Sequence, residues 1–350
     1  FTNHFVALED KFAGKKIDSN KSELTLHKIR TSNTILCNGH IERFISFRNN
    51  DLPGVMLASS FEKYIHRYGV VPEEKPVIFT NNSSSMSLLN SMLSLGCKPE
   101  AYVDSRKNEE IETDIKKILK ENNIPSYFEA EIEGCDGNKK IEKITIRKGK
   151  IFIKIKSSML CVSGGYNPDI HLFTQSKGLL KWDKNIASFK PDTPFQKTLT
   201  LGSVSGNYNF NKLCDEINEK LSFLNTAKLD FEIKLNVSNK YSIKELWETK
   251  SKINSNWSKS FIDLHNDVTI KDLKQAITEG FDRIEHLKRY TTNSMGTDQG
   301  KISSINSLAI VSKILKKEIS EVGTTTYRPP YAPLSFAAIA GRSTYEFYDP

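Results

Sequence analysis

The fold class is decided by one stretch, PVIFTNNSSSMSLLNSMLSLGCKPEAYVDS, which occupies residues 76–105. Within it an apolar run at 76–80 leads through a serine-rich turn at 81–85 into an amphipathic helix, and a second apolar run ends in Asp104. This order of strand, turn, helix and strand is typical of half a nucleotide-binding α/β domain, in which a carboxylate at the position of Asp104 often binds a ribose. The turn lacks the G-x-G-x-x-G spacing that lets backbone approach a pyrophosphate. We therefore interpret this unit mainly as architecture.

Length and composition describe a globular chain of two or three domains, with 350 residues, 38% hydrophobic and 26% charged. No apolar run approaches the roughly 20 residues of a membrane span and no signal peptide is recognisable, so we expect a cytoplasmic protein without a membrane partner. The net charge of +8 comes from lysines interspersed with acids, which does not favour a nucleic-acid partner.

The five cysteines, Cys37, Cys97, Cys135, Cys161 and Cys214, are far apart. Their spacing matches neither a metal site nor a disulfide framework, and it predicts reduced thiols and no bound metal. Because Cys37 and Cys161 lie in apolar runs, we expect both to be buried and inert.

Several predicted strands end in glycine. Gly39 and the pair Gly164-Gly165 each follow an apolar run, and Gly202 and Gly206 precede an amphipathic helix. Glycine at the carboxyl end of a strand is where α/β folds allow a ligand to approach the backbone. The sequence therefore predicts ligand contact at these turns.

From about residue 236 the pattern becomes helical. Thr269 and Asp272 form a predicted capping box, and Gly280 marks the end of that helix. Two further helices are predicted at about 281–290 and 303–315, before a proline-rich extended segment.

Four stretches then resemble a known family. They are CNGHIERFISFRNNDLPGVMLASS at 37–60, CVSGGYNPDIHLFTQSKGLLKWD at 161–183, FIDLHNDVTIKDLKQAITEGFDRIEHLKRYTTNSMGTDQGK at 261–301, and VGTTTYRPPYAP at 322–333. In this order they resemble the alpha subunit of heterotetrameric sarcosine oxidase. The resemblance implies an α/β fold with disulfide-reductase-like nucleotide-binding domains of the FAD/NAD(P)-binding type, followed by a small helical domain.

The resemblance also implies a domain organisation. An incomplete first nucleotide-binding domain is expected at 1–70 and 151–235, an inserted second Rossmann-like domain at 71–150, and the helical domain at 236–320. Residues 321–350 are expected to lead toward a missing aminomethyltransferase-like domain. The family's first strand and its G-x-G-x-x-G are expected upstream of residue 1.

In activity, the family implies an oxidoreductase that works in a complex. Sarcosine is oxidised to glycine at FAD in a beta subunit, electrons pass to FMN at the alpha–beta interface and then to oxygen, giving hydrogen peroxide, and tetrahydrofolate takes the one-carbon unit. Beta, gamma and delta subunits are the implied partners. On this reading the chain carries no catalytic residue and is inactive alone, and its role is to bind NAD. By match to the family, the NAD-binding candidates are Gly202, Ser203, Gly206, Tyr208, Gly39 and His40.

The helical domain resembles the cluster-binding domain of bacterioferritin-associated ferredoxin. The four ligand positions are occupied by Asp263, His265, Asp298 and Ser303, which are not the thiolates that hold an iron–sulfur cluster, so we expect none. Hydroxyls and cations nearby suit a phosphate, and we expect them to face the FMN phosphate. These candidates are Lys288, Arg289, Thr291, Thr292, Lys301, Thr324, Thr325 and Arg328. The alternative is a helix connection that satisfies itself and binds nothing.

Two other functions stay open. A related flavin-dependent amine or opine dehydrogenase subunit would share the fold but should carry cluster-binding cysteines, and a non-catalytic nucleotide-binding scaffold would need the fold alone. A lone histidine, His171, could act as a base, but a structural role is the simpler interpretation.

Overall fold

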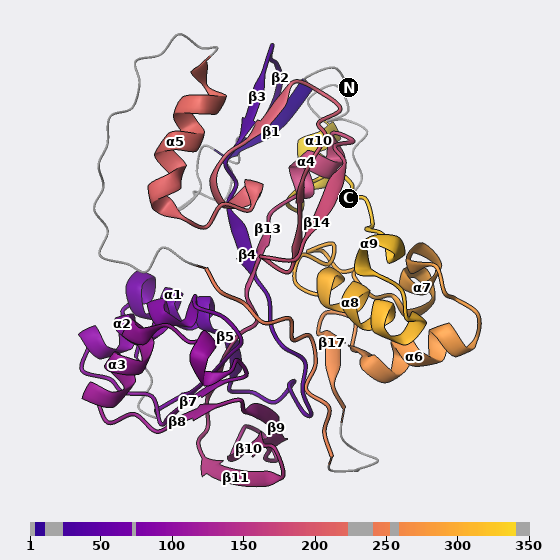
Figure 1. The fold of residues 1–350 in the computed structure, drawn as a ribbon. Coiled ribbons are helices and arrows are strands. Elements are labelled where there is room, and N and C mark those ends of the chain that lie inside the picture. Colours follow the sequence, from indigo (N-terminus) through magenta and orange to yellow (C-terminus); the bar gives the residue numbers. More distant parts are fainter. Residues whose placement is uncertain (1–3, 11–23, 72–74, 223–240, 253–258, 341–350) are drawn as a thin grey trace.

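The computed structural model describes residues 4–10, 24–71, 75–222, 241–252 and 259–340. Figure 1 shows three parts: a parallel sheet with helices α1–α3, an elongated region of short strands that carries the N-terminus, and a helical unit of α6–α9. The segment after residue 240 runs from the first part to the third.

A five-stranded parallel sheet forms the centre of the first part, in the order β5-β12-β6-β7-β8. Its strands are β5 (Val55–Leu57), β12 (Leu160–Ser163), β6 (Val77–Thr80), β7 (Ala101–Asp104) and β8 (Ser126–Phe128). The three central strands are buried at every residue because both faces of the sheet are covered. The predicted strand, turn, helix and strand of residues 76–105 is confirmed as β6, α2 and β7.

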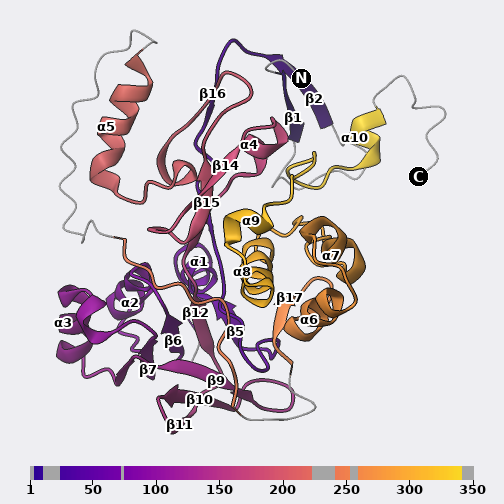
Figure 2. The ribbon, with the colours of Figure 1, turned by 45° about the vertical axis from the view of Figure 1, so that its right-hand side comes forward.

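Helices and strands cover opposite faces of this sheet (Figures 1 and 2). Helices α1 (Ala58–Tyr68), α2 (Ser85–Ser94) and α3 (Thr113–Glu121) pack on one face, and the antiparallel strands β9 (Glu131–Asp136), β10 (Lys143–Lys148) and β11 (Ile151–Lys156) lie across the other. Because the sheet also includes β5 and β12, it is wider than the predicted inserted domain at 71–150. The chain enters through β5 and α1 and leaves through β12.

The elongated region is built from paired short strands. These are the hairpins β1 (His4–Asp10) with β2 (Leu24–Arg30) and β14 (Leu180–Asp183) with β15 (Ser188–Pro191), the parallel pair β3 (Thr34–Leu36) with β16 (Thr198–Thr200), and the antiparallel pair β4 (His40–Glu42) with β13 (Tyr166–Pro168). The short helices α4 (His171–Gln175) and η2 (Gly202–Ser205) and the longer α5 (Phe210–Lys220) complete it. The prediction that Cys37 is buried is wrong, because β3 pairs with a single strand and leaves the thiol exposed, whereas Cys161 in the central sheet is buried as predicted.

The third part packs three helices around an apolar core. Strands β17 (Phe261–Asp263) and β18 (Val268–Thr269) lead into α6 (Ile270–Thr278), α7 (Ile284–Thr291), α8 (Ser304–Leu315) and α9 (Ile319–Val322), and α10 (Phe336–Ala340) follows. The predicted capping box of Thr269 and Asp272 is confirmed. Phe189 and Trp247 join this core, so the helical unit is attached to the elongated region through buried apolar side chains. Across the described ranges, no helix has the length and hydrophobicity needed to cross a membrane.

Candidate functional site

A cavity of about 600 Å³ lies where the elongated region meets helix α2. It is bordered by four of the six residues predicted to bind NAD: His40, Gly202, Ser203 and Tyr208. The opposite wall comes from the start of α2, a turn that the sequence assigned to architecture. The residues of that wall are Ser83, Ser84, Met86, Ser87, Asn90 and Ser91.

Four aromatic rings form one wall of the cavity. The rings of His40 and Tyr166 have centroids 4.0 Å apart, and those of Tyr208 and Tyr241 are 4.8 Å apart. Tyr166 lies 5.8 Å from Tyr208 and connects the two pairs. Burial raises the pKa of the Tyr166 hydroxyl, with the charge of Glu42 adding to the effect, so the phenol is neutral near pH 7. Such a surface is suited to a planar ring, which aromatic side chains contact by stacking.

The glycines predicted to admit a ligand differ in what surrounds them. Gly202 has a φ of +74°, and a Cβ added there would first meet Leu213 at 3.6 Å; one added at Gly39 would meet Ser203 at 4.0 Å. Both therefore border open space. Gly206 does not line the cavity, since a Cβ there would lie 3.1 Å from Ile186. The left-handed φ of +83° at Gly206 shapes the turn before α5 instead.

A carboxylate of this chain occupies the donors next to Gly202. Glu216 on α5 accepts from the Gly202 N–H at 3.2 Å, from the Ser205 hydroxyl at 2.6 Å and from the Asn207 amide at 2.9 Å. Burial tends to raise the pKa of Glu216, but the Lys220 ammonium and these donors hold it below the usual range. The donors beside Gly202, which were expected to be available to a ligand, are thus hydrogen-bonded to Glu216.

Other residues of the chain cover the carboxyl ends of strands β6 and β7. Asp104 forms a buried ion pair with Arg106 at 2.8 Å, and Arg106 also contacts Glu112 at 3.2 Å. The segment 241–244 crosses the strand ends, where Ser83 N–H donates to the Ser242 carbonyl at 3.0 Å. Asp104 is therefore engaged by a cation of the chain and not open to a ribose.

The Gly164-Gly165 pair also serves packing. A Cβ at Gly164 would lie 2.7 Å from the carbonyl oxygen of Phe44, and one at Gly165 would lie 2.5 Å from Ile243. The guanidinium of Arg43 donates to the Gly164 carbonyl at 2.7 Å and fills the space beside them. The prediction of ligand contact at this pair is wrong, because two crossing segments of the chain occupy the space.

In the helical unit, the connection at 292–303 brings the four former ligand positions together. The Asp263 carboxylate accepts from the Ser294 N–H at 2.6 Å, and the Ser303 hydroxyl is 3.0 Å from that of Ser294. A Cβ at Gly296 would meet His265 at 3.0 Å and Asp298 at 3.4 Å. Two of the four positions, Asp263 and Ser303, are thus hydrogen-bonded to Ser294 of the loop. The described residues contain no group of three His, Cys, Asp or Glu side chains placed to hold a metal ion.

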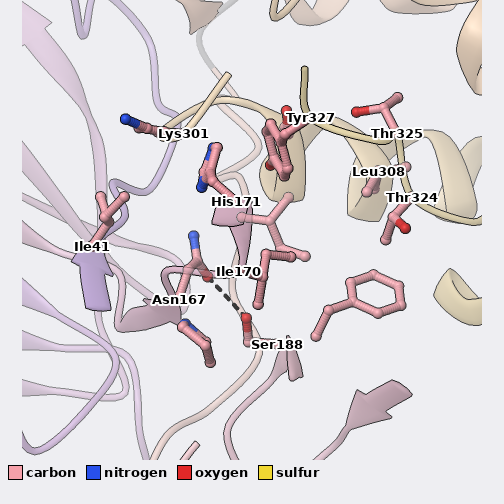
Figure 3. A pocket seen from close by; sticks show the side chains of 14 residues that line it. Ile41, Asn167, Ile170, His171, Ser188, Lys301, Leu308, Thr324, Thr325 and Tyr327 are labelled. Atoms are coloured by element: carbon pink, nitrogen blue, oxygen red, sulfur yellow. Dashed lines mark hydrogen bonds between the residues drawn. The ribbon is translucent and has the colours of Figure 1, made fainter. Parts of the chain in front are cut away.

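A second, much smaller cavity of about 30 Å³ lies between this loop and α4 (Figure 3). Its wall includes three of the residues predicted to face FMN, namely Lys301, Thr324 and Thr325, together with His171 and Tyr327. The space suffices for about two water molecules. The Lys301 ammonium donates to the Tyr331 carbonyl at 3.0 Å and lies 3.8 Å from the centre of the Tyr331 ring.

His171 on that wall is almost fully buried. Its Nδ1 is 2.8 Å from the Asp169 carboxylate, and its Nε2 has no hydrogen-bond partner among the described residues. Tyr331 donates its hydroxyl to the other Asp169 oxygen. Burial tends to raise the pKa of Asp169, but the bonds from His171, Tyr331 and Asn38 bring it below the usual range. These contacts agree with the structural interpretation of His171 as a link to the segment at 324–331.

The remaining candidates for the FMN phosphate do not converge. Arg289 is exposed and pairs with Glu285 at 3.1 Å, while the hydroxyls of Thr291 and Thr292 donate to carbonyls of helix α7 and its end. Lys288 is half-buried, which lowers its pKa, and it lines a separate cavity of about 10 Å³ with Thr325. Arg328 is exposed, and its backbone is bonded to Gln299. Four of the eight residues therefore border the two small cavities, and the other four, Arg289, Thr291, Thr292 and Arg328, line neither.

Sequence reasoning missed the other half of the large cavity. Tyr166, Tyr241 and Ser84 belong to its wall, although Ser84 was assigned to an architectural turn and Tyr241 lies 33 residues beyond Tyr208. The clustering of serines at the start of α2 was a usable signal. The pairing of β4 with β13, which brings Tyr166 beside His40, has no counterpart in local sequence.

Comparison with known proteins places the chain beside one group of enzymes. Residues 257–342 match the family model of the sarcosine oxidase A3 domain. Over 336 residues the chain is 31% identical to the sarcosine oxidase subunit alpha of Rhizobium meliloti (strain 1021). The aligned region covers 93% of this chain and 32% of that protein. The chain is 30% identical to the same subunit of Corynebacterium sp. (strain U-96), over 92% of this chain and 35% of that one. The chain spans about a third of the length of these relatives, and the predicted resemblance is confirmed.

The fold is shared with a solved structure. L-proline dehydrogenase from P. horikoshii superposes with a TM-score of 0.62 at 19% identity, covering 96% of this chain and 62% of that chain. This likeness concerns the fold alone. The predicted class, an α/β protein of the FAD/NAD(P)-binding type followed by a small helical domain, is confirmed.

Proposed function

We propose that this chain is the nucleotide-binding part of a sarcosine oxidase alpha subunit and that NAD binds in the cavity between His40 and Ser203. One observation carries the proposal: four residues matched to the family's NAD site, from segments about 160 positions apart, border one cavity. The relatives named sarcosine oxidase subunit alpha, similar over nearly the whole chain, supply the family.

The cavity has the properties that a dinucleotide needs. Its volume of about 600 Å³ lies within the roughly 300–1,000 Å³ typical of small-molecule sites. The rings of His40, Tyr166 and Tyr208 offer a stacking surface, and the serines of α2 offer hydroxyls opposite. NAD, when bound, supplies a nicotinamide ring that can accept a hydride. The residues of this chain bind that dinucleotide and orient it.

In the complete enzyme, sarcosine is oxidised to glycine in a beta subunit that carries FAD, the electrons reach oxygen through FMN at the alpha–beta interface, and tetrahydrofolate accepts the one-carbon unit. The present chain docks against beta, within a heterotetramer that includes gamma and delta. The residues that would face FMN are Lys301, Thr324 and Thr325. Because the cavity that they share holds about 30 Å³, the flavin phosphate would meet them at the surface and not inside.

The test is NAD binding by the full-length alpha subunit, measured by calorimetry. Ser203→Val places a branched apolar side chain on the cavity wall and should weaken binding at least tenfold. Ser94→Val, on the exposed end of α2 away from the cavity, is the matched control and should leave binding unchanged. Equal affinities of the Ser203→Val variant and the unmodified protein would refute this site.

The activity has its own test. The chain alone, given sarcosine, FAD and FMN, should form no hydrogen peroxide, whereas the assembled complex should. Peroxide formation by the isolated chain would show that the oxidation site lies here and not in a partner.

A further inference from the structure

Glu42 lies at the inner end of a row of side chains that starts in the large cavity. It is 5% exposed and closes strand β4, and in the β4–β13 pair it stands directly opposite Tyr166. His40 is two residues earlier and so points to the same face of the strand. The row therefore runs from His40 and Tyr166 at the cavity wall to Glu42 in the interior.

Hydroxyl groups connect Glu42 to the cavity. The Glu42 carboxylate accepts from the Ser59 N–H at 2.7 Å and is hydrogen-bonded to the side chain of Ser163. The Ser163 hydroxyl lies 3.1 Å from that of Ser84, and Ser84 is hydrogen-bonded to the Tyr166 hydroxyl. Ser84 lines the cavity, so the hydroxyls of Ser163 and Ser84 connect Glu42 to it.

The surroundings of Glu42 do not stabilise a negative charge strongly. Burial raises the pKa of Glu42 to about 7, against the opposing effect of its bonds from Ser59 and Ser163, and the nearby carboxylate of Glu62 raises it further. The other titratable neighbours are Cys161, Tyr166 and Tyr241, whose pKa burial raises, and His40, whose pKa burial lowers. They are therefore neutral near pH 7, where Glu42 exchanges its proton.

The Ser163 hydroxyl has different hydrogen-bond partners when Glu42 is ionised and when it is protonated. An ionised carboxylate is an acceptor alone, so the Ser163 hydroxyl must donate to it. A protonated carboxyl can donate to Ser163, which frees the Ser163 proton for Ser84. The Ser84 hydroxyl donates to the Asn82 side-chain oxygen and can therefore only accept from Ser163, so the state of Glu42 determines whether Ser84 on the cavity wall receives the Ser163 proton.

We propose that Glu42 is a positioning residue of the cavity, which takes up a proton when an anionic dinucleotide binds and thereby turns the Ser163 hydroxyl from Glu42 toward Ser84. The inference rests on the proposed function, because it concerns NAD in that cavity. NAD carries a net negative charge, and a second negative charge buried nearby is costly where the effective dielectric constant is low. Binding therefore favours protonated Glu42.

Linkage fixes the direction of the pH effect. If binding takes up a proton, affinity falls as the pH rises above the pKa of free Glu42, by at most tenfold per pH unit for one group. The affinity for NAD should therefore decrease from about pH 6.5 to about pH 8.5, and proton uptake should be largest between the free and bound pKa values.

The experiment uses the full-length alpha subunit and NAD, with calorimetry in two buffers of different ionisation enthalpy, which yields the number of protons taken up. Uptake of a fraction of a proton near pH 7 is expected, and Glu42→Gln should abolish it and flatten the pH profile. Glu62→Gln removes a neighbouring charge and should shift the profile to lower pH while keeping the uptake. Glu285→Gln, an exposed acid on α7, should change neither.

The outcomes separate this inference from the proposed function. Failure of NAD to bind the unmodified protein would overturn both. Binding without proton uptake, or uptake that persists in Glu42→Gln, would overturn the inference alone. Should the variant not fold, the infrared band of a protonated carboxyl in the unmodified protein decides: it should grow when NAD is added near pH 7, and its absence contradicts the proposal.

Discussion

Two glycines with the same backbone conformation have opposite surroundings. Gly202 at the large cavity and Gly300 in the loop of the helical unit have φ values of +74° and +76°. A Cβ at Gly202 would first meet Leu213 at 3.6 Å, whereas one at Gly300 would lie 2.3 Å from both Ser294 and Ser304. The first glycine borders space that a ligand can use, and the second borders the chain's own side chains.

Glu216 takes the polar groups next to Gly202, but the rest of the cavity wall differs from the loop. In the loop, the hydroxyls of Ser294, Ser303 and Ser304 are bonded to one another, so the loop satisfies itself. On the cavity wall, rings and hydroxyls face about 600 Å³ of open volume. A glycine-rich, hydroxyl-rich sequence therefore predicts a tight turn in both places, and a ligand site in the place where the chain leaves the space empty.

The largest effect is expected from Gly300→Ala. A left-handed φ costs a residue with a Cβ about 1–2 kcal/mol, and forcing a methyl group into a filled space costs about 1–3 kcal/mol more. The variant should lose about 2–5 kcal/mol of unfolding free energy, measured by urea denaturation. Gly202→Ala is the control at equal φ and should lose about 1–2 kcal/mol, from strain alone. Equal losses would remove the distinction between the two regions.

The next effect concerns the pH dependence of stability, which should be concentrated at the cavity. Glu42 has its pKa raised by burial from 4.5 to about 7, so between these values the folded state binds more protons than the unfolded state. Stability from this group is therefore present below about pH 4.5 and is lost as the pH rises through 7. The total is about 3 kcal/mol, since each pKa unit corresponds to about 1.4 kcal/mol.

Urea denaturation of Glu42→Gln between about pH 5 and pH 8 measures this loss as the difference in slope from the unmodified protein. A variant with the same slope would show that Glu42 does not titrate in this range. The change in the loop, Gly300→Ala, adds and removes no titratable group and should leave the slope unchanged.

How far the sequence could predict these regions follows from the range of the interactions. The order β6, α2, β7 and the capping box of Thr269 depend on neighbours a few residues apart, and both were predicted. The cavity wall depends on the pairing of β4 with β13 and on Tyr241 reaching Tyr166, contacts between positions more than 70 residues apart. Local patterns contain no information on such register.

The family resemblance supplied part of that missing information. It selected His40, Gly202, Ser203 and Tyr208, which the structure brings to one cavity, and it also selected Gly206, which the structure places against Ile186. A motif match identifies a turn, but the side of the turn that faces a ligand depends on packing from elsewhere in the chain.

A smaller effect is expected at the buried carboxylate of Asp263. Asp263 is buried and accepts from the N–H groups of Ser294 and His265, at 2.6 and 2.9 Å. Asp263→Asn weakens both bonds and should cost about 1–2 kcal/mol of unfolding free energy, because hydrogen bonds to a charged group are the stronger ones. Asp267→Asn, at a neighbouring exposed position, should cost almost nothing. If the two variants were equally stable, Asp263 would not hold the loop.

The smallest effect is expected at Thr292, which ends helix α7 with a φ of +60°. A β-branched residue is strained in this region by about 1–2 kcal/mol, and glycine relieves that strain at an entropic cost of about 0.5–1 kcal/mol. Thr292→Gly should therefore stabilise the protein by about 0.5–1 kcal/mol, whereas Thr291→Gly, one residue earlier within the helix, should destabilise it by about 0.3 kcal/mol through helix propensity. Thermal unfolding of the two variants gives the signs directly. Because the Thr292 hydroxyl donates to the Thr291 carbonyl, it is not free to bind a phosphate, and the proposed complex should bind FMN equally well when this threonine is glycine. Loss of FMN from Thr292→Gly, with stability preserved, would instead show that the loop contacts the flavin and would make the two regions alike in function as well as in sequence.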